Sequence, residues 1–207
     1  MSPRLNKSLT LLELLIALGL ITRVVLAFMS VQIFSNFHLT TSGRQTQLQN
    51  EISLALAHMS KYVQQGVGPL SLETVPAGIP PNGFRVRVDR NATPTPANIN
   101  DDSWVSYALV GNTLSCNCTL VSSGAACTDF VGGDLASHIL SGVSSPTSLP
   151  AIPAAGFYIN ITNPGPLSGS TIEVALAARW DPASTVRLDN PQVVMKTKVY
   201  ATSASAK

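Results

Sequence analysis

The sequence predicts an α+β protein, in which one long N-terminal membrane and stalk helix packs on an antiparallel β-sheet head. Three observations support this prediction. An apolar run near the N-terminus is followed by a helical apolar stripe, and no proline interrupts residues 5–68. A cluster of Gly and Pro then ends the helical pattern. From residue 68 onward the chain consists of short β patterns separated by turns.

The apolar run is long enough to cross a membrane. Residues 9–21 read LTLLELLIALGLI, and VVLAFMSVQIF follows after Thr22 and Arg23. A membrane-spanning helix needs ~20 residues of this kind. The polar stretch before it holds Arg4 and Lys7, which favours a cytoplasmic N-terminus. We therefore expect residues 9–36 to form a single-pass transmembrane and assembly helix, with the rest of the chain outside the cytoplasm.

A cleaved secretory signal peptide would explain the same apolar run. However, no small-x-small cleavage site follows the first apolar block, as such a signal requires. The helical pattern also continues past the apolar run, where a mature domain would begin with turns. The sequence therefore favours a retained helix over a removed signal. A plain membrane anchor remains the simple alternative.

One carboxylate, Glu13, stands inside the apolar run. A charged side chain at this depth costs ~2.5–3.5 kcal/mol on insertion scales, so a partner must offset the cost. We expect that partner to be a positive charge from a neighbouring subunit, which makes Glu13 a candidate assembly residue. Arg23 is the second charge in the run. It can reach toward the interface with its long side chain, or pair with an acid of another subunit.

The next segment, residues 37–67, has the pattern of an amphipathic stalk helix. Its apolar residues recur at spacings of three and four, which places them on one face. They are Leu48, Ile52, Leu56, Met59 and Val63. We expect this stripe to pack against the head. Gly66, Gly68 and Pro69 should end the helix. Weak helix formers at residues 40–43 are compatible with a bend.

Residues 68–207 are predicted to form the β-rich head. Gly111-Asn112 separates two β patterns and indicates a hairpin turn. A short helix is expected over residues 134–140. The expected strands cover residues 84–88, 104–110, 113–121, 157–161, 171–180 and 193–200.

The head contains the three cysteines of the chain, Cys116, Cys118 and Cys127. One local disulfide with one remaining thiol is the plain interpretation, in keeping with an oxidising compartment. Cys118 and Cys127 are the favoured pair, because Cys116 and Cys118 are too close for a relaxed link on one strand. The C-x-C…C spacing without a nearby His is poor for zinc. No metal or cofactor is predicted. The loop acids Asp101, Asp102, Asp129 and Asp134 offer the oxygen ligands that calcium takes, but they are interpreted as solvated loop acids.

Residues 7–15, KSLTLLELL, resemble the N-terminal signature of the type IV prepilin family. The family pattern is a short basic leader, a small residue, an apolar residue, Thr, Leu and then Glu at mature position five. The resemblance implies that residues 1–8 are a leader, and that prepilin peptidase cuts between Ser8 and Leu9. Leu9 would then be N-methylated, and Glu13 would be the fifth mature residue. The chain departs from the family in Ser8 and Leu9, which stand where Gly and Phe are usual.

The order of the β patterns is similar to that of the J-type minor pseudopilins of type II secretion and the W-type minor pilins. The resemblance implies a structural subunit that acts in the assembly, priming or tip of a type IV pilus or a type II secretion pseudopilus. Its implied partners are other pilin or pseudopilin subunits, prepilin peptidase, the inner-membrane assembly platform and membrane lipid. The implied location is the inner (cytoplasmic) membrane with the head extracytoplasmic, at a filament tip or the cell surface.

Other function classes find little support in the residues. The formal net charge is +2, so no basic surface indicates nucleic acid. There is no G-x-S-x-G nucleophile elbow and no phosphate-binding glycine loop. The histidines His38, His58 and His138 are scattered. We therefore expect no enzyme. The competing hypothesis is a membrane-tethered extracytoplasmic binding module that does not polymerise.

Overall fold

The computed structural model describes residues 10–66, 72–74, 82–89, 98–144, 155–162 and 171–200. It has one long N-terminal apolar helix that packs against β-sheets, which confirms the predicted α+β fold class. The chain divides into two compact units, Met1–Ser42 and Gly43–Lys207. The second unit thus begins within the segment predicted as the stalk.

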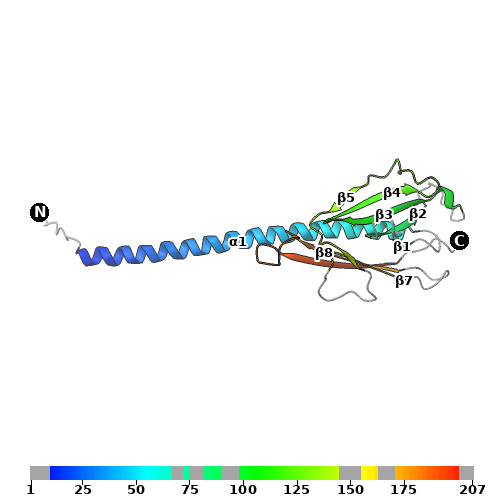
Figure 1. Ribbon diagram of the computed structural model, residues 1–207. Coiled ribbons are helices and arrows are strands. Elements are labelled where there is room, and N and C mark those ends of the chain that lie inside the picture. Colours follow the sequence, from blue (N-terminus) through cyan, green and yellow to red (C-terminus); the bar gives the residue numbers. More distant parts are fainter. Residues whose placement is uncertain are drawn as a thin grey trace. The chain divides into compact units, whose positions relative to one another are not determined.

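Helix α1 extends over Leu11–Gln64, a length of 54 residues (Figure 1). It ends just before Gly66, as the cluster of Gly and Pro predicts. Helical hydrogen bonding is also continuous through residues 40–43. Several hydroxyl groups of α1 donate to the carbonyl four residues earlier, at distances of 2.7–2.9 Å, among them those of Thr22, Ser30, Thr40 and Ser60. The helix backbone therefore satisfies these polar side chains without any outside partner.

The first sheet of the head is a five-stranded antiparallel sheet with the order β1-β2-β3-β4-β5. The predicted hairpin is present, because β3 and β4 pair along their whole length around Gly111. Gly111 has a φ of 62°, which glycine adopts without strain. The strands are β1 Leu72–Thr74, β2 Gly83–Val88, β3 Ser103–Val110, β4 Thr113–Leu120 and β5 Gly133–Ala136, and a 3-10 turn covers Ile99–Asp101.

The second sheet has the order β6-β7-β8-β9. Strands β7, β8 and β9 are antiparallel, whereas the short β6 runs parallel to β7. The head therefore contains two sheets, and the second sheet is mixed. The strands are β6 Val143–Ser144, β7 Phe157–Thr162, β8 Thr171–Arg179 and β9 Gln192–Tyr200.

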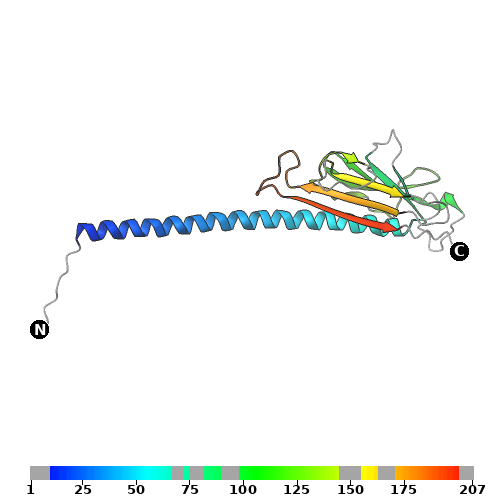
Figure 2. The ribbon, with the colours of Figure 1, turned by 90° about the horizontal axis from the view of Figure 1, so that it is seen from below.

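The core of the second unit lies between the end of α1 and the two sheets (Figure 2). The predicted stripe of α1 is buried, with 0–6% of each side chain exposed: Leu48, Ile52, Leu56, Met59 and Val63. The rings of Phe84 on β2 and Phe157 on β7 lie 6.2 Å apart, which connects the two sheets through the core. Burial of the stripe explains its spacing, since residues three and four apart share one helix face.

The helix predicted over residues 134–140 is wrong. Residues up to Ala136 belong to β5, which pairs with β4, and Ile139 bridges to Ala178 on β8. Between them His138 has a φ of 63°, in the left-handed region that an α-helix does not use. Pairing with a neighbouring strand thus outweighs the local helical tendency of this segment.

The prediction of a solvated Asp102 is also wrong. Its side chain is 1% exposed, and its Oδ2 lies 3.1 Å from Nε of Arg87 on β2. Burial raises the pKa of Asp102, and the Arg87 guanidinium opposes that shift. A buried charge needs a partner, and Arg87, which is itself 6% exposed, supplies it.

Candidate functional site

The first turn of α1 holds the carboxylate that the sequence singles out. Glu13 Oε2 lies 3.4 Å from both the backbone N and the hydroxyl oxygen of Thr10. In return, the Thr10 hydroxyl accepts a hydrogen bond from the Glu13 backbone N–H at 3.3 Å. This reciprocal arrangement is a capping box, which satisfies backbone donors at a helix start. Sequence reasoning missed Thr10, although the T-x-x-E spacing before an apolar run is its signature.

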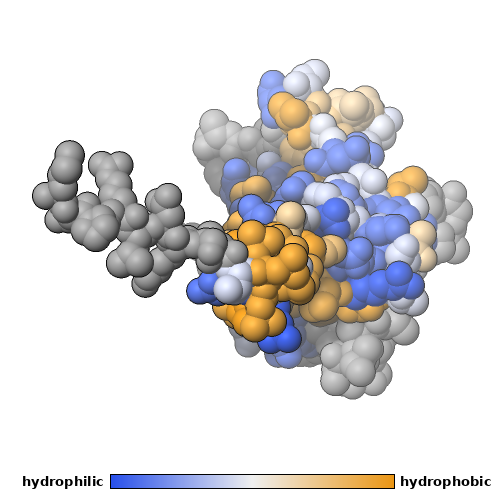
Figure 3. All heavy atoms as spheres, turned by 90° about the vertical axis from the view of Figure 1, so that its left-hand side faces the viewer, coloured by the Kyte–Doolittle hydropathy of each residue, from blue (hydrophilic) through white to orange (hydrophobic). Residues whose placement is uncertain are grey.

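Within unit 1, the apolar side chains of α1 are exposed around the whole helix. From Leu11 to Leu39 the large apolar residues are 50–81% exposed. Figure 3 shows apolar side chains gathered at the end of the molecule that faces the viewer. Among the described residues, α1 is the single helix long and apolar enough to cross a membrane, and its most apolar stretch is not buried at all. A helix of this kind can serve as a membrane anchor or a signal.

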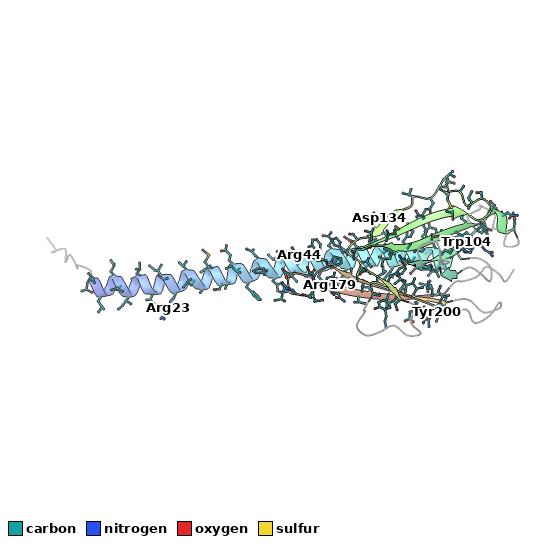
Figure 4. All side chains as sticks on the ribbon, viewed as in Figure 1. Arg23, Arg44, Trp104, Asp134, Arg179 and Tyr200 are labelled. Atoms are coloured by element: carbon teal, nitrogen blue, oxygen red, sulfur yellow. A yellow bond between two sulfur atoms is a disulfide. The ribbon has the colours of Figure 1, made fainter. Side chains whose placement is uncertain are left out.

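Arg23 lies in the same apolar segment, ten residues after Glu13. Its side chain extends outward from the helix (Figure 4). It makes no hydrogen bond or ion pair with any other residue in the part of the chain that the structure describes. The apolar segment therefore carries one negative and one positive side chain and is otherwise uncharged.

The proposed processing site, Ser8 and Leu9, lies outside the described residues, which begin at Thr10. Peptidase cleavage between these two residues and N-methylation of Leu9 therefore stay predictions. Of the three residues assigned to processing and assembly, the structure places Glu13 alone. Its position in the first turn leaves one carboxylate oxygen, Oε1, without a hydrogen bond to a described residue.

In the head, a disulfide joins Cys118 to Cys127, the pair that the sequence favours. Their Cα atoms lie 5.4 Å apart, within the usual range for a disulfide. Cys116 and Cys118 are both on β4, two residues apart, so they share one face of that strand. Cys116 is a free, buried thiol, and burial raises its pKa. The disulfide closes the segment between β4 and Cys127, while Cys116 packs as a small apolar side chain.

A polar and aromatic cluster joins the start of the stalk portion of α1 to the loops of the head. The Arg44 guanidinium carbon lies 5.1 Å from the centre of the Trp180 ring, and the His138 ring stacks on Trp180 at 5.1 Å. Arg44 also donates a hydrogen bond to the Asp189 carbonyl. Glu51 Oε2 accepts from the Ser137 backbone N–H at 3.3 Å and from its hydroxyl at 3.1 Å. Figure 4 labels Arg44 on this part of α1.

This cluster brings together a serine, a histidine and a glutamate, but it lacks the geometry of a catalytic triad. The Ser137 hydroxyl and Glu51 Oε2 both lie near the same ring nitrogen of His138, Nδ1, at 2.8 and 3.7 Å. A relay requires the nucleophile and the acid at opposite ring nitrogens. The cluster instead fixes the segment after β5 on the helix, a role that no sequence motif announces because its members come from four separate segments.

The loop between β8 and β9 is held by internal hydrogen bonds and exposes apolar side chains. The buried Asn190 side chain donates to the carbonyls of Asp181 and Thr185 and accepts from the Asp181 backbone N–H. Val186 and Leu188 of the same loop are 57% and 87% exposed. The head thus presents an apolar tip on a loop whose shape is fixed by hydrogen bonds.

Within the described ranges, the head also has a groove beside the end of α1. This shallow groove of about 320 Å³ lies between the end of α1 and β9, and its lining is a mixture of polar and apolar surface. It is lined by Ser60, Gln64, Thr197, Lys198, Val199 and Tyr200. No three His, Cys, Asp or Glu side chains of these ranges gather in an arrangement that could hold a metal ion.

No family model, no curated protein and no solved structure matches the chain. The function is therefore argued from the residues and their geometry.

Proposed function

We propose that the chain is a type IV pilin-like structural subunit. Prepilin peptidase cuts it between Ser8 and Leu9, and Leu9 is then N-methylated. The helix of residues 9–36 anchors the subunit in the inner membrane with the head extracytoplasmic. The subunit acts in the assembly, priming or tip of a type IV pilus or a type II secretion pseudopilus. Its partners are other pilin or pseudopilin subunits, the assembly platform and membrane lipid.

The observation that carries this proposal is Glu13 in a helix segment with an exposed apolar surface. The large apolar side chains around it are 61–81% exposed from Leu11 to Leu15, so the described residues of this segment leave the carboxylate uncovered. In a bilayer such a carboxylate requires a partner of opposite charge. Cleavage after Ser8 creates one, because Leu9 then carries a free α-amino group.

The amine and the carboxylate pair best between two subunits. Thr10 already engages Glu13 Oε2 within the chain, and Oε1 is free to accept a hydrogen bond from an ammonium of a neighbour. Hydrogen bonds between ionised groups are about twice as strong as neutral ones, and both groups here are poorly solvated. Each subunit then offers a carboxylate to one neighbour and an amine to another, which suits a filament.

The capping box favours a second candidate function. If Glu13 serves only to start the helix, the chain is a membrane-tethered binding module that does not polymerise. The three hydrogen bonds between Thr10 and Glu13 are long, at 3.3–3.4 Å, and so of limited strength. A cap of this kind contributes about 0.5–2 kcal/mol to helix stability.

Three variants separate the two functions. Thr10→Ala removes the cap and keeps the carboxylate. Glu13→Gln keeps a side chain that can complete a capping box and removes the charge. Glu13→Ala removes both. For an assembling subunit, Thr10→Ala should assemble nearly normally, Glu13→Gln should be intermediate, and Glu13→Ala should be lost from the complex, since breaking a buried charge pair costs about 3–5 kcal/mol.

The measurement is co-purification of each variant with its partner subunits, normalised to its amount in the membrane fraction. Insertion of Glu13→Ala should equal or exceed that of wild type, because the intramembrane charge is gone. If Glu13→Ala assembles as well as wild type, the pilin-like function is wrong. A loss that is equal for Thr10→Ala and Glu13→Ala would assign Glu13 to the cap alone.

A further inference from the structure

The apolar segment of α1 contains two charges of opposite sign. Over residues 11–42 these are Glu13 and Arg23, and no other Asp, Glu, Lys or Arg occurs there. Both lie where the surface of the helix is otherwise apolar and exposed. The segment is thus neutral as a whole, although each charge by itself is unfavourable in a membrane.

The two charges are too far apart to pair within one helix. Ten residues correspond to a rise of about 15 Å and a rotation of about 280°. Side chains of one helix meet at spacings of three and four, not ten. Glu13 bonds locally to Thr10, and Arg23 has no polar partner among the described residues. An acid of another molecule can supply the partner that Arg23 does not find among the described residues.

We infer that Arg23 of one copy binds the Glu13 carboxylate of a second copy of the same chain within the membrane. This inference rests on the proposed function, since it takes the segment to be inserted and the subunits to associate. Charge complementarity identifies the occupant, because a second copy brings both the acid that Arg23 lacks and an arginine for its own neighbour. Arginine is suited to this task, because it stays charged and offers several N–H donors, so it can reach a Glu13 oxygen that Thr10 or a Leu9 amine also contacts.

The pairing fixes how two helices are offset. Two parallel copies at the same height would place like residues side by side, with Glu13 near Glu13 and Arg23 near Arg23. Pairing of Glu13 with Arg23 instead raises one copy by about 15 Å relative to the other. The offset is somewhat smaller in practice, because helical side chains lean toward the N-terminus and the arginine leans toward its acid.

Because of this offset, two copies cannot satisfy each other's Glu13 and Arg23 at the same time. Each copy uses Glu13 toward one neighbour and Arg23 toward the other, so the two surfaces of the contact differ. Such head-to-tail contacts generate rings or open helical assemblies. The axial offset favours the open assembly, since each added copy is displaced in the same direction. Arg23 thereby becomes a residue that sets the register of the subunits.

Exchange of charges between two chains tests the pairing. Two differently tagged copies are co-expressed in a host without related subunits, solubilised in mild detergent and co-purified. Variant Glu13→Arg alone places arginine against arginine, and Arg23→Glu alone places carboxylate against carboxylate. Each should self-associate at least about tenfold less than wild type, because like charges then meet in a poorly solvated contact. When the two variants are mixed, both contacts become complementary, and association should return.

Three outcomes would overturn the inference. The first is that wild-type copies do not co-purify with each other. The second is that Arg23→Glu self-associates as wild type does. The third is that the mixture associates no better than either variant alone. Because a charge exchange can impair insertion, Arg23→Gln and Arg23→Lys are measured beside it, each normalised to its membrane level. Arg23→Gln should lose association although it inserts more readily, and Arg23→Lys should retain most of it.

The same experiment separates failure of this inference from failure of the proposed function. If Glu13 pairs solely with a Leu9 amine, Arg23→Glu keeps both partners and assembles normally, while Glu13→Ala does not. That result removes the role of Arg23 and leaves the pilin-like subunit in place. If Glu13→Ala and Arg23→Glu both associate normally, neither account holds.

Discussion

The two parts of α1 share one backbone conformation and have opposite surroundings. From Leu11 to Leu39 the large apolar side chains are at least half exposed on every face of the helix. From Leu48 to Val63 the apolar side chains of the stripe are nearly inaccessible, and most of the residues outside the stripe are polar. The comparison shows that burial is set by side-chain pattern rather than by helix formation. An all-round apolar surface calls for lipid or other subunits, whereas a stripe calls for a core.

Substitution of one buried and one exposed leucine, both in the stalk portion of α1, tests the comparison most strongly. Leu48 is 0% exposed and Leu54 is 71% exposed. Leu48→Ala should lower the free energy of unfolding by about 2–5 kcal/mol, because it removes packed methyl groups and leaves a cavity. Leu54→Ala should change it by less than about 0.5 kcal/mol. Denaturant unfolding of the full chain in detergent, followed by tryptophan fluorescence, measures both.

Equal effects of the two substitutions would contradict the assignment of the stripe to the core.

This buried face could be predicted from the sequence, since the spacing of Leu48, Ile52, Leu56, Met59 and Val63 places them on one side of the helix. The hairpin at Gly111 was available for the same reason, because a turn signal separates two β patterns. Local patterns were thus sufficient wherever the local and tertiary preferences agree.

The sequence-based predictions are wrong where contacts between residues distant in the sequence determine the local structure. The segment of β5 has helix-compatible residues, yet it pairs with β4, a contact that no local pattern records. Arg87 and Asp102, fifteen positions apart in the sequence, are buried together as an ion pair. At the candidate site, Glu13 stood out because a carboxylate is rare in an apolar run. The cluster of Arg44, Trp180 and His138 did not, because its members converge only in the folded head.

The next largest effect is expected at the disulfide, which stabilises the head but not the apolar segment. Reduction of Cys118–Cys127 should lower the free energy of unfolding of the head by about 2 kcal/mol, near the lower end of the usual range because the closed loop is short. Unfolding with and without reductant gives the difference. The double variant Cys118→Ala, Cys127→Ala should not respond to reductant, and Cys116→Ala should respond as wild type does.

Thiol counting provides an independent check of the same bond. Alkylation of denatured protein should modify one cysteine without reductant and three with it. In native protein Cys116 should react slowly, because it is buried and its pKa is raised. Three reactive thiols in native protein purified from an oxidising compartment would contradict the disulfide.

The smallest expected effect is a dependence of head stability on pH through His58. Burial, and secondly the charge of Lys61, lower the pKa of His58 from its ordinary value. Below about pH 6.5, His58 therefore binds a proton more readily in the unfolded chain than in the folded head. The stability that His58 contributes should be complete above about pH 6.5 and should be lost as pH falls through the lower folded-state pKa.

His58→Gln should weaken this loss of stability, because glutamine does not titrate. The measurement is the denaturant midpoint of wild type and variant between about pH 7 and about pH 5. An identical pH dependence in both proteins would remove His58 as its source.

The central claim is that the all-round apolar part of α1 belongs to a processed, assembling subunit rather than to a plain anchor. The N-terminus of the mature chain tests this most directly. Intact-mass and peptide mass spectrometry of protein from the membrane fraction should find a chain that begins at Leu9 and carries an N-methyl group. A chain that begins at Met1 or Ser2, or one that begins beyond residue 25, would contradict the claim.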